Sequence, residues 1–218
     1  MKDRVVLALK NLRRYGRRTV ITAAAIAVGL AMYLVLDSML LGIERESEIN
    51  LIRYETSSAA AMTEAYWEER DERPLEHLIE ETQAVIEELE AAGVPATRRT
   101  VFPAELVVYR DPYPEDGSLQ GLIHAIDPEQ NDAVLELRDS VTEGRYLQAD
   151  QHGVVIGAWL ADKLGAEVGY PLTIVTRTRK GFYQTLDLEI TGIMNSPNPV
   201  VNRSGIYISY HTADTFLQ

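Results

Sequence analysis

The feature that most limits what this chain can fold into is an apolar run from Thr19 to Ile43, which contains one charged residue, Asp37. An α-helix rises about 1.5 Å per residue, so about twenty apolar residues cross a hydrocarbon layer of roughly 30 Å. This run has 25 residues, which is enough to cross the layer with some tilt. We therefore predict a transmembrane helix over residues 19–43.

Two other interpretations of the run fit less well. The apolar part of a cleaved signal peptide has about 7–15 residues, and the small residues of Ser57–Ala61 that could serve as a cleavage site follow a charged stretch. A buried helix of a globular domain would not need 25 nearly uncharged residues. Asp37 lies near the outer end of the run, where a carboxylate costs less than at the bilayer centre. We therefore interpret it as an interfacial group rather than a proton relay.

Basic residues before the run predict how the chain is oriented. Residues 1–18 contain seven Lys or Arg and one acidic residue. Those nearest the run are Arg13, Arg14, Arg17 and Arg18. Positive flanks stay on the cytoplasmic side, so we expect a cytoplasmic N-terminus with everything after Ile43 outside the cytoplasm. Residues 1–18 also have the pattern of a basic amphipathic helix on the inner leaflet, with a plain flank as the alternative.

The rest of the chain is acidic. Residues 44–218 contain 14 basic and 31 acidic side chains, which argues against the basic footprint of a nucleic-acid-binding domain. The same charge disfavours a domain that lies flat on an anionic membrane. The chain has no Cys, so disulfides, thiolate metal sites and thiol catalysis are excluded.

Small residues are dense in the predicted membrane helix. Ala25 and Gly29 form a small-x-x-x-small pair, and further Ala residues surround them. Such residues let two helix backbones approach closely. We therefore predict that Ala25 and Gly29 pack against other membrane helices.

Hydrophobic periodicity divides the remaining chain into a helical extension over 44–56 and an extracytoplasmic α+β core over 57–218. Apolar residues at spacings of three and four after Pro74 predict an amphipathic helix that ends before Gly93. Alternating apolar and polar residues between turn signals predict a mostly antiparallel sheet. The expected elements are strands over 101–110, 119–126, 154–156, 172–179, 185–193 and 205–209, a helix over 158–164, and a C-terminal helix from 211.

No motif in the chain points to catalysis or to a cofactor. The sequence has neither a Walker A phosphate loop nor the Gly-x-Ser-x-Gly nucleophile turn. His77 stands at helical spacing from Glu80 and Glu81, but a second His four residues away is missing, so we interpret the group as a solvated acidic face. We name no catalytic, cofactor-binding or metal-binding residue and expect no enzyme activity.

Two loops are candidates for recognition. Trp67 stands beside the charged segment 68–73, and the segment 196–203 contains Pro197 and Pro199. Loops of this kind often carry binding residues. The alternative for both is an ordinary surface loop with a half-buried aromatic or proline.

Several segments, taken in order and spacing, resemble one family. The N-terminal LALKNLRRYGRRTVITAAAIAVGLAMYL (Leu7–Leu34) resembles the first membrane segment of FtsX/MacB/LolE-type ABC-transporter permeases. Later segments resemble the MacB-like periplasmic core domain. They are AIDPEQN (Ala125–Asn131), EGRYL (Glu143–Leu147), VVIGAWLADKLGAEVGYPLTI (Val154–Ile174), LEITGIMNS (Leu188–Ser196) and IYISYHTADTFL (Ile206–Leu217). The DPEQN and EGRYL pair is most similar to lipoprotein-release permeases of the LolC/LolE type. Ala125 and Tyr170 depart from the family, which commonly has Gly and Asp there.

The resemblance implies a permease subunit of an ABC transporter in the bacterial inner membrane, with its main domain in the periplasm. The implied partners are an ATPase subunit that binds ATP and Mg²⁺, a second permease subunit (the same chain or a different one), the lipid bilayer, and a lipoprotein or other envelope protein. Such permeases carry three further membrane helices after this domain, whereas this sequence ends at Gln218. We therefore expect the N-terminal part of a permease, or a short relative with one helix.

Three functions remain open at this point. The first is lipoprotein-release transport driven by the partner ATPase. The second is a permease of the same fold that serves MacB-like efflux or FtsX-like mechanotransmission. The third, from another class, is an anchored periplasmic binding or accessory module that never meets an ATPase.

Overall fold

The computed structural model describes residues 15–108, 119–149 and 151–217. It divides into two compact units, an N-terminal unit (Met1–Glu48) and a sheet domain (Ile49–Gln218). Arg13 and Arg14, the predicted amphipathic segment before them, and the predicted turn between the first two strands lie outside the described residues.

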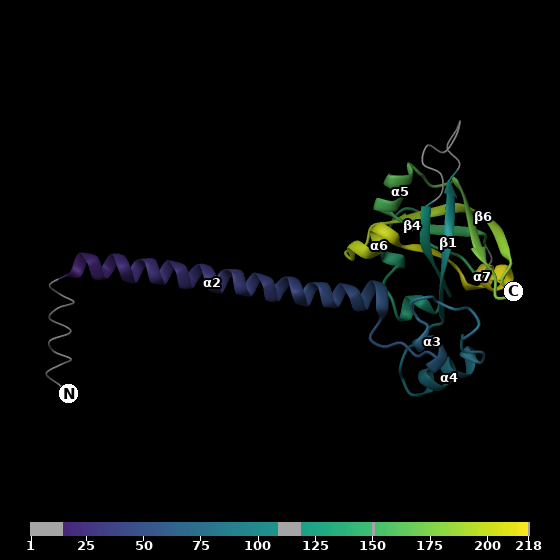
Figure 1. Cartoon of the computed structure of the whole chain (residues 1–218), viewed down its shortest axis with the longest axis horizontal. Coiled ribbons are helices and arrows are strands. Elements are labelled where there is room, and N and C mark those ends of the chain that lie inside the picture. The colour runs from purple at the N-terminus through teal and green to yellow at the C-terminus, as the bar shows by residue number, and fades with distance from the viewer. Residues whose placement is uncertain (1–14, 109–118, 150, 218) are drawn as a thin grey trace. The chain divides into compact units, whose positions relative to one another are not determined.

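Helix α2 (Gly16–Leu51) has 36 residues, none of them buried, and is one unbroken helix in Figure 1. At about 1.5 Å per residue it is about 54 Å long, and it is apolar enough to cross a membrane. It continues directly into a short π-helix, η1 (Ile52–Thr56). Ala25 and Gly29 lie in its first half, and Arg17 and Arg18 lie in its first turn.

The sheet domain contains one seven-stranded sheet. Its strands are β1 (Arg99–Val108), β2 (Leu119–Ile126), β3 (Val141–Gly144), β4 (Gly153–Gly157), β5 (Pro171–Arg177), β6 (Tyr183–Met194) and β7 (Ile206–Ser209). They are arranged in the order β3-β6-β4-β7-β2-β1-β5. Only the β2–β7 and β4–β6 pairings are parallel, which confirms the predicted α+β class with a mostly antiparallel sheet.

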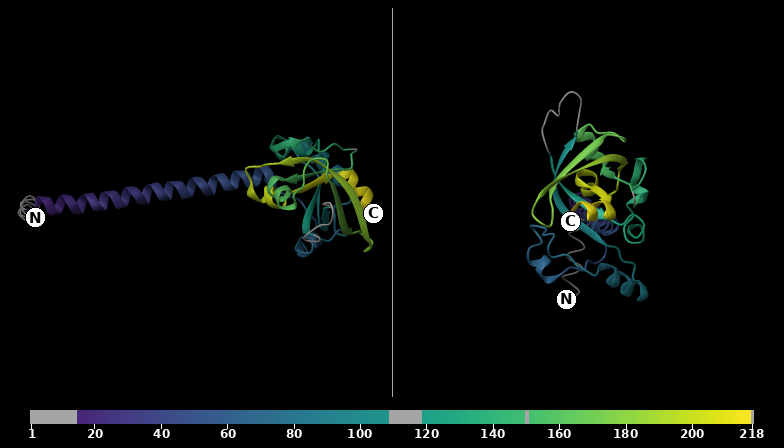
Figure 2. Two further views of the ribbon diagram at one scale, coloured as in Figure 1. Left: turned by 90° about the horizontal axis from the view of Figure 1, so that it is seen from above. Right: turned by 90° about the vertical axis from the view of Figure 1, so that its right-hand side faces the viewer.

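Strand β6 closes the sheet into a ring. Its first half pairs with β5, and its second half pairs with β4 and β3. Glu189 is opposite Pro171 on one side and Gly153 on the other. Because β5 also pairs with β1, six strands follow one another around the ring, and Figure 2 shows the strong twist of this sheet.

Alternation along the strands separates two cores. On β7, Ile206 and Ile208 lie in the larger core while Tyr207 points to the smaller one. Successive side chains of a strand point to opposite faces, so the two cores lie on opposite faces of the sheet. The larger core includes Phe102, Ile123, Ile156, Ile174 and Ile190, and the smaller one includes Ile126, Leu137, Tyr146, Val155 and Met194.

The helices of the sheet domain are short. They are α3 (Glu64–Glu68), α4 (Thr82–Ala91), α5 (Ala158–Leu164), α6 (Pro199–Ser204) and α7 (Tyr210–Leu217), with 3-10 turns η2 (Asn131–Ala133) and η3 (Arg138–Ser140). Helix α5 ends at Gly165 in the left-handed conformation, with φ 60°, as the sequence predicts. Neither helix α6 nor strand β3 was predicted from the sequence.

The predicted helix that begins at Pro74 is wrong in its first half, because only 82–91 is helical. Leu75 is buried in the larger core, and the carbonyl of His77 accepts a hydrogen bond from Thr63 Oγ1 at 2.7 Å. These tertiary contacts hold residues 74–81 in turns. The hydroxyl of Thr82 donates to the carbonyl of Ile79 at 2.8 Å, where the helix begins.

Two glycines explain parts of the family motifs. Gly144, in EGRYL, has φ 71°, a conformation that favours glycine. Gly157, in VVIGAW, lies against the backbone of α6, and a Cβ at this position would be 2.4 Å from the carbonyl oxygens of Val201 and Asn202. Backbone conformation therefore favours glycine at position 144, and close packing favours it at position 157.

We predict that Gly157→Ala destabilises the domain by about 1–3 kcal/mol, because the backbone of α6 must move away from β4. For a chain of this size each kcal/mol lowers Tm by about 2–4 °C. Thermal unfolding of the full chain in detergent, followed by circular dichroism, measures the effect. Gly42→Ala, where a Cβ meets nothing within 4 Å, is the control, and equal Tm values for the two variants would contradict the packing argument.

Candidate functional site

The π-helix η1 gives α2 a defined end. The N–H of Ser57 donates to the carbonyl of Ile52 at 3.1 Å, across five residues. Ser57 has φ 61° and ψ −176°, a combination that is rare for residues with a Cβ and costs about 1–3 kcal/mol. Single π-turns occur frequently at functional sites, so the contacts of η1 define a candidate site.

Glu55 connects η1 to two separate parts of the sheet domain. Its carboxylate Oε2 accepts a hydrogen bond from Asn198 Nδ2 at 3.0 Å. Its backbone carbonyl accepts a hydrogen bond from Arg99 Nη1. Glu55 therefore joins η1 to the start of β1 and to the loop before α6.

Asn198 is held in place by its own loop. Its Oδ1 accepts from the N–H of Val200 at 2.8 Å and caps α6, in which Pro199 is the first residue. Its N–H donates to Ser196 Oγ at 3.1 Å, and Asn202 Oδ1 accepts from the N–H of Ser196 at 2.7 Å. Both ends of the Asn198 amide are occupied, one by α6 and the other by Glu55, so the donor to Glu55 is fixed in position.

Tyr54 and Arg53 attach η1 to a third place, the segment before η3. The hydroxyl of Tyr54 donates to Glu136 Oε2 at 3.4 Å, and its ring packs against the smaller core. Partial burial, followed by the Glu136 carboxylate, raises the pKa of Tyr54. Arg53 Nε lies 3.6 Å from Glu136 Oε1, and its carbonyl accepts from the N–H of Glu136 at 2.9 Å. Because the two charged side chains are about half exposed, this ion pair contributes less than about 1 kcal/mol.

His124 and Tyr207 lie beside Arg99, on the paired strands β2 and β7. Their rings stack with centroids 5.1 Å apart and planes 27° apart. Burial, followed by the positive charges of Arg99 and Arg73, lowers the pKa of His124 to about 3. Burial raises the pKa of Tyr207 to about 12. The imidazole is therefore neutral at physiological pH, and its buried Nδ1 has no hydrogen-bond partner within the described ranges.

The AIDPEQN segment organises the end of β2. Asp127 Oδ1 accepts from the N–H groups of Glu129 and Gln130 at 3.2 and 3.3 Å. Its other oxygen binds Arg98 Nη2 at 3.2 Å, and the guanidinium of Arg98 lies 4.0 Å above the ring of Tyr210 in α7. This motif thus fixes a turn and connects it to the C-terminal helix.

The three predicted recognition residues are exposed but not gathered at one place by any contact that the structure describes. Trp67 lies in α3, with its ring 4.4 Å from the guanidinium of Arg70. Pro197 and Pro199 flank the buried Asn198. Their recognition role stays a prediction. The sequence analysis missed Glu55, Arg99 and Asn198. For Asn198 a signal existed, since Asn followed by Pro is a common way to begin a helix.

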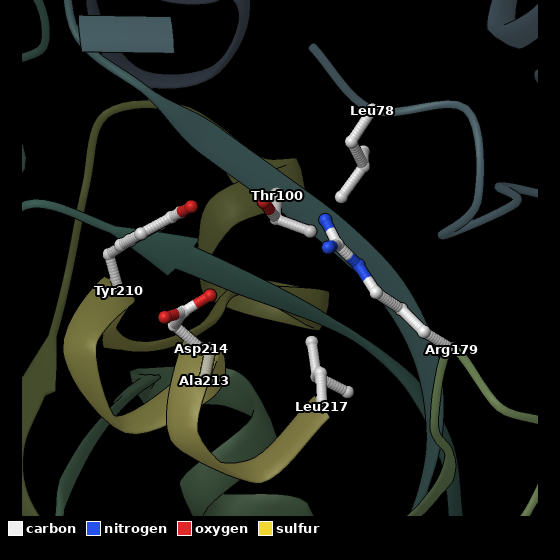
Figure 3. Close-up of a pocket in the computed structure, with 7 residues that line it drawn as sticks. All are labelled: Leu78, Thr100, Arg179, Tyr210, Ala213, Asp214 and Leu217. Carbon is white, nitrogen blue, oxygen red and sulfur yellow. The ribbon is translucent and has the colours of Figure 1, made fainter. Parts of the chain in front are cut away.

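No chemistry beyond binding is visible in the described part of the chain. It contains no group of three His, Cys, Asp or Glu side chains that could hold a metal ion. A small pocket is lined by Leu78, Thr100, Arg179, Tyr210, Ala213, Asp214 and Leu217 (Figure 3). Its volume of about 20 Å³ has room for a water molecule and not for a substrate. The contacts of η1 with β1, with the loop before α6 and with Glu136 lie within the sheet domain, and we call them the joint.

We predict that Asn198→Asp weakens this joint while the cap of α6 survives. Aspartate keeps the oxygen that accepts from Val200 but places a carboxylate against that of Glu55. Losing the hydrogen bond to a charged group costs about 1–3 kcal/mol, measured as a fall in Tm. The double variant Glu55→Gln, Asn198→Asp restores a donor and an acceptor, so it should recover most of the loss. If the double variant is no more stable than Asn198→Asp, the pairing is wrong.

A second prediction concerns pH. The unfolded chain binds a proton at His124 near pH 6.5, and the folded chain does not until about pH 3. The unfolded state therefore gains stability below pH 6.5, and the free energy of unfolding falls by up to about 1.4 kcal/mol per pH unit. His124→Phe keeps the stacking ring and removes the proton site. We expect Tm between pH 7 and pH 5 to fall less in this variant than in the parent chain, and parallel curves would refute the assignment.

Comparison with known proteins identifies the type of domain. The family model described as the MacB-like periplasmic core domain matches residues 19–218. A search among curated proteins finds no match. Among solved structures, the chain is similar to a crystallised domain of a protein named as a permease from Porphyromonas gingivalis. The identity is 15%, the TM-score is 0.37, and the match covers 52% of this chain and 45% of that one, so this chain spans less than half the length of that relative.

Proposed function

Because the chain belongs to the family of MacB-like periplasmic core domains, within the FtsX/MacB/LolE superfamily of ABC-transporter permeases, we propose that it carries motion of a membrane helix into a periplasmic domain. In this proposal α2 spans the inner membrane with its N-terminus in the cytoplasm, where Arg17 and Arg18 follow the positive-inside rule. A separate partner subunit binds ATP and Mg²⁺ and supplies the energy. This chain then has a mechanical role and no catalytic one.

The joint at η1 is the observation that carries the proposal. Helix α2 continues without interruption into η1, and η1 is bonded to β1, to the loop before α6, and to Glu136. A helix can transmit a push or a rotation only through groups that are attached to it. Three attachments within five residues make such transmission possible at this end of α2.

For the periplasmic work itself we favour lipoprotein release, because DPEQN (Asp127–Asn131) and EGRYL (Glu143–Leu147) are most similar to permeases of that type. The alternatives are efflux and mechanotransmission by a permease of the same fold. A periplasmic adaptor together with an outer-membrane channel among the partners would favour efflux, and a hydrolase would favour mechanotransmission. The partners that we expect in every case are an ATPase subunit and a second permease subunit.

The first experiment is purification of the tagged native protein from its own membranes under mild detergent. We expect a nucleotide-binding subunit with a Walker A loop to co-purify in a near-equal amount, and mass spectrometry identifies it. Bound lipoprotein in the same preparation would support the release function. A preparation that contains no nucleotide-binding subunit would favour the anchored accessory module and overturn the permease proposal.

We also predict that Ala25→Leu with Gly29→Leu weakens assembly with partner membrane helices. The two larger side chains keep the helix apolar, so insertion should be unaffected, but they prevent close approach of backbones. Co-purification of the partner subunits should fall at least severalfold. The control, Val28→Leu with Leu30→Val, exchanges apolar residues of ordinary size. Equal recovery of partners from both variants would remove the packing role of Ala25 and Gly29.

A further inference from the structure

The tip of the β5–β6 hairpin, residues 177–183, exposes two adjacent aromatic side chains. Phe182 is 70% exposed and Tyr183 is 78% exposed. No other large apolar side chain in the described parts of the chain, including those of α2, has so high an exposed fraction. A soluble surface rarely leaves two neighbouring aromatic rings so bare unless they bind something. The tip is therefore a candidate interaction surface.

The tip is held in one conformation. The N–H of Thr178 donates to the carbonyl of Phe182 at 2.8 Å, and the N–H of Gly181 donates to the carbonyl of Thr178 at 2.9 Å. Arg177 Nε donates to the carbonyl of Gly181 at 3.0 Å. A hydrogen bond of 3.1 Å from the N–H of Arg179 to the carbonyl of Leu217 ties the tip to α7. A surface that is already ordered loses little entropy when it binds.

The charge of the tip is opposite to that of the domain. Residues 177–183 contain three basic side chains and no acid, whereas residues 44–218 contain 14 basic and 31 acidic side chains in all. The complementary chemistry is present elsewhere on the same domain, around α4. Its exposed acids, which we call the acidic face, are Glu80, Glu81, Glu87, Glu88 and Glu90. Two exposed apolar side chains, Leu89 and Val94, accompany them.

The tip lies beside the segment that leads into the acidic face. Leu78, just before the acidic face, and Arg179, in the tip, line the same small pocket (Figure 3). In a two-fold symmetric dimer, the same surface of both copies forms the contact. If the axis passes between two complementary patches, the first patch of each copy meets the second patch of the other copy. The acidic face also disfavours an anionic membrane as the partner of the tip. A membrane that reached the tip would come close to these glutamates, which carry the same charge as the membrane.

From these observations we infer that the hairpin tip of one copy binds the acidic face of a second copy of this chain, in a reciprocal contact. Phe182 and Tyr183 supply apolar area against Leu89 and Val94, and Arg177 and Lys180 meet the glutamates. This inference rests on the pairing of two permease subunits proposed above and adds the surface through which their periplasmic domains meet.

The absence of Cys from the sequence allows a direct test with the full chain. Two differently tagged copies are co-expressed, one with Tyr183→Cys and the other with Glu87→Cys, and disulfide formation is measured in membranes. We expect a yield at least tenfold above that of the control pair, Tyr183→Cys with Glu129→Cys, which places the second thiol at an exposed acid far along the sequence. Lys180→Glu in the first copy should reduce the yield, and Glu90→Lys in the second copy should restore it.

The possible outcomes distinguish a wrong contact surface from a failure of the two copies to pair. If the tagged copies co-purify but the disulfide yield equals the control, the surface is wrong while pairing stands. If the copies do not co-purify, the reciprocal contact is overturned, and recovery of the ATPase subunit still tests the permease function. Photocrosslinking from a benzophenone side chain at position 182 identifies what contacts the tip. Labelling of a second copy supports the inference, whereas labelling of lipid or of an unrelated protein contradicts it.

Discussion

Glu55 makes the two hydrogen bonds that attach the π-helix η1 to distant segments of the sheet domain. Its carbonyl and its carboxylate are bound by Arg99 and Asn198, which lie far apart in the sequence. Hydrogen bonds to charged groups are roughly twice as strong as neutral ones, and Asn198 cannot rotate away without uncapping α6. The side chain that binds the Glu55 carboxylate is therefore fixed by its own hydrogen bonds within the sheet domain, and the proposed transmission requires an attachment of this kind.

Strand β6 is also fixed within the sheet domain. Since it pairs with β5 in its first half and with β3 and β4 in its second half, it cannot shift without breaking contacts on both sides. The cores on the two faces of the sheet share β4 and β7, whose alternate residues point into one or the other. Close packing transmits displacement because it leaves little room for local relaxation. Under the proposed function, a movement that enters at η1 reaches the hairpin tip as motion of the sheet domain.

Local patterns predicted the fold better than the site. Alternation along β1, where Phe102, Ala104, Leu106 and Val108 are buried, and the Gly165 helix end are signals within a few residues, so the strands and α5 were predictable. The helix from Pro74 was wrong because the burial of Leu75 overrides its apparent periodicity. Strand β3 was missed because its four residues are not buried. No local sequence pattern could predict the joint, because Glu55 and Asn198 are 143 residues apart.

The ring of six strands also limits how this domain can recruit other proteins. Each strand of the ring pairs with a neighbour on both sides over at least part of its length, so no ring strand offers one whole edge to an added strand. Among the described strands the exception is β3, which has one neighbour, four residues and an irregular register. A partner peptide gains little from so short a template. Side chains on the helices and turns are therefore the better place for recognition by this domain, and single substitutions there can change a partner without disturbing the sheet.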